Sequence, residues 1–69
     1  MKDSLIVVTL IGAKGDRVPV AVTDIQSYAD EWKRLYPEKK VQCRRMDYYK
    51  AFDIAMANPD TIQVKLKVL

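Results

Sequence analysis

The sequence predicts an α+β fold: a two-layer sandwich in which a four-stranded mixed sheet carries two helices on one face, in the order ββαβαβ. Two segments have the apolar periodicity of amphipathic helices, and four have the length and alternation of strands. Each predicted helix lies between two predicted strands along the chain. The 69 residues are expected to form one domain, 1–69. A chain this short buries only about 60% of the surface that its unfolded form exposes.

The first two strands are expected to form a hairpin. Residues 5–11 are rich in β-branched side chains and are apolar on both alternating sets, which is typical of a strand covered on both faces. A turn with two glycines leads to a second strand at 17–22, where Pro19 favours an edge because it has no N–H to donate. Alternation also predicts strands at 39–44 and at 61–69.

The helices are predicted at 23–36 and at 47–58, each with a single apolar stripe. Thr23 and Gln26 have capping-box spacing, Asp47 is a suitable N-cap, and a proline follows the end of each helix. Both strand–helix–strand connections are expected to be right-handed. If the strands advance across the sheet in one direction, both helices lie on the same face, and the other face stays open.

The composition argues against an enzyme, a metal site and a cofactor. The chain has no histidine, and Cys43 is its only cysteine, expected to point into the core, where a thiol is inert. A lone cysteine without a disulfide favours the cytoplasm. The longest apolar run is too short to span a membrane, and its charged flanks do not match those of a signal peptide.

One short motif is open to a nucleic-acid interpretation. Residues 10–15, Leu-Ile-Gly-Ala-Lys-Gly, resemble the Ile-Gly-x-x-Gly loop of KH domains over about six residues. In that family the loop joins two helices and clamps a nucleic-acid backbone. Here the flanking segments predict strands, so a hairpin turn explains the same two glycines.

The charge pattern supplies the candidate site. The chain has twelve basic and nine acidic residues, a net charge of +3. The polar side chains predicted to point to the open face of the sheet include five cations and no acid. They are Arg17, Lys40, Gln42, Arg44, Gln63, Lys65 and Lys67. An apolar stripe of Ile6, Val8 and Leu10, one alternating set of the first strand, is expected to lie between them.

An exposed apolar stripe flanked by cations is typical of a contact site for an anionic partner. The sequence therefore favours a small accessory or inhibitor protein that docks onto a larger protein with an acidic surface. A second interpretation is a nucleic-acid-binding protein that contacts the phosphate backbone through the same face. A third is a homodimeric module, of the kind common in phages and mobile elements, that pairs across this face.

Overall fold

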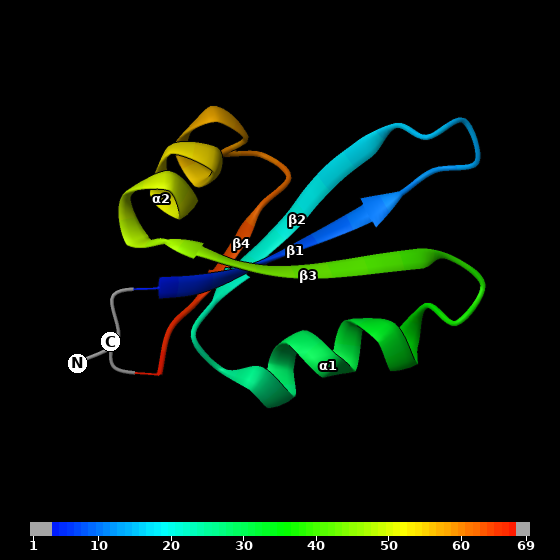
Figure 1. Ribbon diagram of the computed structural model, residues 1–69, viewed down its shortest axis with the longest axis horizontal. Helices are drawn as coiled ribbons and strands as arrows, with labels where there is room; N and C mark the ends of the chain where they lie inside the picture. The colour runs from blue at the N-terminus through cyan, green and yellow to red at the C-terminus, as the bar shows by residue number, and fades with distance from the viewer. Residues whose placement is uncertain (1–3, 68–69) are drawn as a thin grey trace.

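The computed structural model describes residues 4–67, which form a four-stranded mixed sheet and two helices in the order ββαβαβ (Figure 1). The α+β class, the mixed sheet and the order of elements are therefore as predicted. The elements are β1 (Ser4–Ile11), β2 (Arg17–Thr23), α1 (Gln26–Leu35), β3 (Lys40–Asp47), α2 (Tyr48–Ala57) and β4 (Gln63–Lys65).

The strand order in the sheet is β3-β1-β2-β4. β1 pairs antiparallel with β2 and with β3, and the short β4 pairs parallel with β2. The predicted hairpin is confirmed: the Gly12 N–H donates to the Asp16 carbonyl over 2.8 Å, and Gly15 has a φ of 85°, a region that favours glycine. The two glycines therefore belong to a turn between strands, so the KH interpretation of this loop was wrong.

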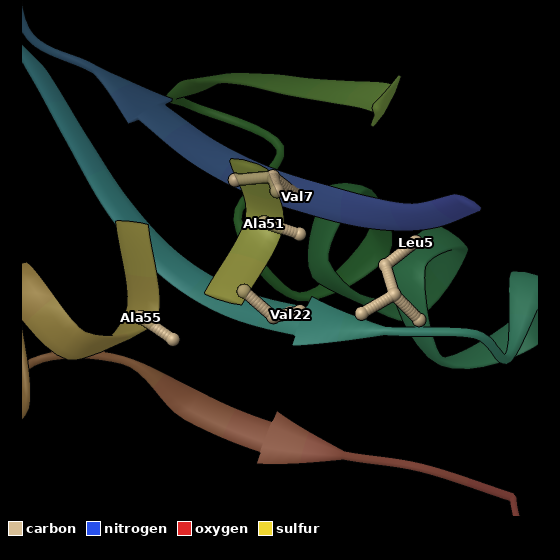
Figure 2. Close-up of a cluster of buried hydrophobic side chains, with 5 residues drawn as sticks. All are labelled: Leu5, Val7, Val22, Ala51 and Ala55. Carbon is tan, nitrogen blue, oxygen red and sulfur yellow. The ribbon is translucent and has the colours of Figure 1, made fainter. Parts of the chain in front are cut away.

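The two helices cover opposite faces of the sheet. Leu5 and Val7 of β1 pack with Ala51 and Ala55 of α2 (Figure 2). The alternating β1 residues pack instead on α1, in a second cluster that contains Ile6, Val8, Ala21 and Ala29. Successive residues of a strand point to opposite faces, and Figure 1 shows α1 and α2 on the two sides of the sheet. The prediction that both helices share one face was wrong.

The strand order explains this arrangement. α1 carries the chain from β2 past β1 to β3, whereas α2 carries it back from β3 past β1 and β2 to β4. Connections of one handedness that run in opposite directions across a sheet place their helices on opposite faces. The condition for a shared face, strands that advance in one direction, is not met.

The largest differences between the observed and the predicted boundaries are in α1, β3 and β4. Thr23 is the last residue of β2, and its Oγ1 accepts a hydrogen bond from the Ile25 N–H at 3.0 Å, so it does not begin α1. β3 continues three residues beyond the predicted end, to Asp47. β4 has only the three residues Gln63–Lys65, and the part of the prediction that falls on 68–69 lies outside the described residues.

Candidate binding site

The predicted apolar stripe is part of the core. Ile6 and Val8 are 2% and 0% exposed, because α1 covers the face of the sheet to which they point. Leu10 belongs to the same alternating set and is half-buried. The assignment of Ile6 and Val8 as contact residues was therefore wrong. The predicted homodimer across this stripe is not supported either, because Ile6 and Val8 are buried beneath α1.

The predicted cations of β2 and β3 lie on the opposite face, the one that carries α2. Lys40 and Arg17 both lie opposite Ile11, and Arg44 lies opposite Val7. Paired residues of neighbouring strands share a face, so the three cations surround the alternating set that begins with Leu5 and Val7. The structure thus brings Arg17, Lys40 and Arg44 together, but around a different part of β1 from the one predicted.

A β-bulge places Arg17 on this face. The register between β1 and β2 shifts between Val8 and Thr9, so that Ala21 pairs with Val8 but Pro19 pairs with Thr9. The extra residue, Val20, packs on the α1 side. Simple alternation would have put Arg17 on the same face as Ala21, under α1. The shift moves Arg17 and Pro19 to the α2 face instead.

A groove lies where α2 ends and the sheet continues. The Asn58 side chain closes the last turn of α2 by donating from Nδ2 to the Ile54 carbonyl over 2.9 Å. The β1–β2 hairpin and β3 extend beyond the end of α2, so the helix leaves this part of the sheet uncovered (Figure 1). The lining of this α2 groove comes from β1, β2, β3 and the C-terminal part of α2: Val7, Thr9, Arg17, Pro19, Gln42, Arg44, Met46, Asp53, Ile54, Ala57 and Asn58.

The α2 groove combines a partly apolar surface with positive charge. Val7, Pro19, Met46, Ile54 and Ala57 supply the apolar part, and Thr9, Gln42 and Asn58 supply hydrogen-bonding groups. Asp53 is its one lining carboxylate. Within residues 4–67 the one ion pair, at 3.9 Å, joins Glu31 and Arg34 of α1. Arg17, Lys40 and Arg44 therefore have no ion-pair partner in the described part of the chain.

Lys65 and Lys67 do not belong to this group. The Lys65 Nζ lies 5.3 Å from the centre of the Tyr28 ring, on the side of the sheet that α1 covers. The Lys67 backbone N–H donates to the Asp24 carboxylate at 2.9 Å, and the neighbouring Gln63 side chain accepts a hydrogen bond from the Tyr28 hydroxyl. These contacts connect β4 and the segment after it with α1 and with the loop that precedes α1.

Sequence reasoning missed the central residues of the groove. It selected the wrong alternating set of β1, and it took Asn58 only as the end of a helix. The sequence did contain a signal for this arrangement. Residues 5–11 are apolar on both alternating sets of side chains, which is typical of a strand that is covered on both faces. With a helix on each face, a polar position such as Thr9 marks the part of β1 that a helix leaves uncovered.

Cys43 lies on the α1 side, as a half-buried residue packed against Ile6, Val8 and Ala29. Burial raises the pKa of its thiol above the ordinary value of 9.0; the nearby Lys33 lowers this pKa, and Asp30 raises it. The Sγ is 3.8 Å from the Ala29 carbonyl, to which it donates. This environment favours the neutral thiol, whereas a nucleophilic cysteine needs the thiolate.

Comparisons of the chain with protein-family models, with curated proteins and with solved structures find no match. Neither of the helices described in residues 4–67 has the length and apolar character needed to cross a membrane. The function is therefore argued from the geometry and the charge of the α2 groove.

Proposed function

We propose that this protein is a non-enzymatic binding protein that docks onto a larger protein with an acidic surface, and that the α2 groove is its contact site. The observation that supports this most directly is that Arg17 and Arg44 line the groove, with Lys40 nearby on the same face of the sheet. Cations without ion-pair partners favour an anionic partner, and the apolar lining between them favours contact with side chains.

The lining of the groove favours a protein over a nucleic acid. Single-stranded nucleic acids are bound by stacking their bases on aromatic side chains, and none of the residues that line the α2 groove is aromatic. Apolar side chains such as Pro19, Met46 and Ile54 offer no hydrogen bonds to a phosphate backbone. They do offer a surface on which the apolar side chains of a partner protein can pack.

The test is a pull-down with the intact chain and two charge-reversed double variants. Arg17→Glu with Arg44→Glu changes the groove, whereas Lys65→Glu with Lys67→Glu changes the net charge equally at the β4 end of the molecule. We expect the unmodified chain and the β4 variant to recover the same acidic protein in stoichiometric amount, and the groove variant to lose it. Loss with both double variants would show that net charge alone drives binding. Retention with the groove variant would overturn the assignment of the site.

A second candidate function is binding to the phosphate backbone of a nucleic acid through the same cations. The specific observation in its favour is that Thr9, Gln42 and Asn58 line the groove beside Arg17 and Arg44, since such polar side chains commonly contact phosphates. This alternative predicts affinity for any duplex or single strand, with an affinity that falls steeply as salt is added. Titration of a fluorescent oligonucleotide at several salt concentrations separates the two functions.

A further inference from the structure

One edge of the sheet is a long, regular strand that has a neighbour on one side only. β3 is the last strand in the order β3-β1-β2-β4, and Figure 1 shows it as the outermost of the three long strands. It pairs with β1 from Lys40 to Asp47 without a shift in register. Apart from this ladder, no backbone–backbone hydrogen bond within residues 4–67 involves residues 40–46. Such an edge presents its remaining N–H and C=O groups to another chain.

The two edges of the sheet differ in how they are protected from pairing. At the other edge, β4 has only three residues, and β2 beside it contains Pro19 and the bulge at Val20. Short strands, prolines and bulges are devices that prevent an edge from pairing, and β3 has none of them. α1 packs over the middle of the sheet, where Ala29 lies with Val8 and Ala21, and none of the β3 residues is buried. β3 is therefore open to pairing along its length.

The charge of β3 indicates what kind of strand pairs with it. The strand contains three exposed cations, Lys40, Arg44 and Arg45, and one acidic residue. Lys40 and Arg44 lie on the α2 face of the sheet, and neither has an ion-pair partner within residues 4–67. Between them, on the α1 side, Val41 and Cys43 are half-buried. An incoming strand thus meets positive charge on one face and apolar side chains on the other.

The cations oppose pairing of β3 with a second copy of this chain. Two antiparallel β3 strands pair about a two-fold axis normal to the sheet, so the register centres on one residue and paired residues share a face. Centred on Gln42, the register sets Lys40 opposite Arg44. Centred on Arg44 or on Arg45, it sets that arginine opposite itself. Centred on Cys43, it places Arg44 diagonal to the Lys40 and the Arg44 of the other copy. Like charges at such positions repel.

We propose that the free edge of β3 binds an extended acidic strand of a partner protein, antiparallel to β3. Main-chain hydrogen bonds supply affinity in this mode, and alternate side chains supply specificity. The partner strand has acidic residues opposite Lys40 and Arg44, a polar residue opposite Gln42, and apolar residues opposite Val41 and Cys43. This inference deepens the proposed function, on which it rests for a protein partner: the strand lies beside the α2 groove, which Gln42 and Arg44 also line.

The first experiment is an NMR titration of the intact chain with a synthetic peptide. The probe is acetyl-Thr-Glu-Val-Thr-Val-Glu-Thr-amide, which has the expected pattern in either direction. Alternate residues of a strand direct their N–H groups to opposite sides, so the N–H groups of either its two valines or its two glutamates face β3. Methylating the backbone nitrogens of one pair should weaken binding by about tenfold or more relative to methylating the other. Equal affinities of the two methylated peptides would overturn the proposal, as would a probe that does not bind.

Charge-reversed variants of the chain locate the bound peptide. Lys40→Glu changes β3 outside the lining of the groove, and we expect it to weaken binding of the unmethylated probe by about tenfold. Lys65→Glu makes the same change on β4, three strands away and beyond a Debye length, and should alter the affinity by less than about threefold. A greater loss with Arg17→Glu, in the groove but on β2, would place the peptide in the groove and overturn the proposal.

These results are distinguishable from those that test the proposed function. If the pull-down recovers an acidic partner through the groove while the two methylated peptides bind equally, the proposed function stands and the pairing at β3 is wrong. If the methylated peptides differ as expected while the intact chain recovers no acidic protein, the pairing at β3 stands and the proposal of a larger acidic partner is wrong.

Discussion

Arg17 of β2 and Lys40 of β3 lie opposite the same residue, Ile11, on the two sides of β1. Neighbouring strands are about 4.8 Å apart, so the backbones that carry these two cations are separated by about 10 Å on one face of the sheet. Neither side chain has an ion-pair partner within residues 4–67. A partner that places acidic groups on both sides of Ile11 would engage the two cations at once.

The two cations should make partner binding sensitive to salt. Replacing Arg17 and Lys40 together with glutamine is expected to lower the affinity for the recovered partner and to reduce the dependence of that affinity on ionic strength. Stability should change by no more than about 0.5 kcal/mol, since both side chains are exposed. Calorimetric titration at several salt concentrations measures both effects. An unchanged salt dependence would mean that other cations contact the partner.

Adjacent residues of β1 should respond differently to the same substitution. Val8→Glu buries a carboxylate beneath α1 at a position with 0% exposure, so we expect the chain not to fold. Thr9→Glu places the same group at a half-buried position on the α2 groove, where it should fold but lose the acidic partner through repulsion. Circular dichroism and pull-down distinguish these results. A folded Val8→Glu variant would contradict the placement of Val8 in the core.

The two core clusters should contribute independently to stability. Trp32 packs on the cluster beneath α1, and Phe52 packs on the cluster beneath α2. Because the sheet separates them, the losses in free energy of unfolding for Trp32→Phe and Phe52→Leu should add to within about 0.5 kcal/mol in the double variant. Urea denaturation of the four proteins measures this sum. A coupling energy above about 1 kcal/mol would indicate that the side chains share one cluster.

Cys43 should make the protein less stable at alkaline pH. Burial raises the pKa of this thiol above 9.0 in the folded state, so above that pH the unfolded chain binds fewer protons than the folded one. The contribution of the neutral thiol is complete below pH 9.0 and declines as the pH rises through the folded pKa. Denaturation of the unmodified chain and of Cys43→Ala from neutral to alkaline pH isolates this effect. Parallel pH profiles for the two proteins would show that Cys43 does not contribute.

Local patterns were sufficient to predict the elements and their order. The β-branched run at 5–11 predicted β1, the glycines after it predicted the hairpin turn, and the apolar stripe with Trp32 predicted α1. These features depend on interactions between residues close in sequence, which a periodicity records directly. The ends were less accurate: Thr23 has good capping chemistry, but its pairing with Ile6 across the sheet keeps it in β2.

The sequence by itself thus determined the strands and helices, and the apolar character of both alternating sets of β1. Only the tertiary structure decided which helix covers which face, because this depends on the strand order β3-β1-β2-β4. That order reverses the direction of the second connection, and no local pattern encodes it. The site was decided in the same way: the bulge at Val20 turned Arg17 toward Lys40 and Arg44, while α1 buried Ile6 and Val8. Long-range pairing sets the face on which a strand residue lies, and a shift of one residue reverses it.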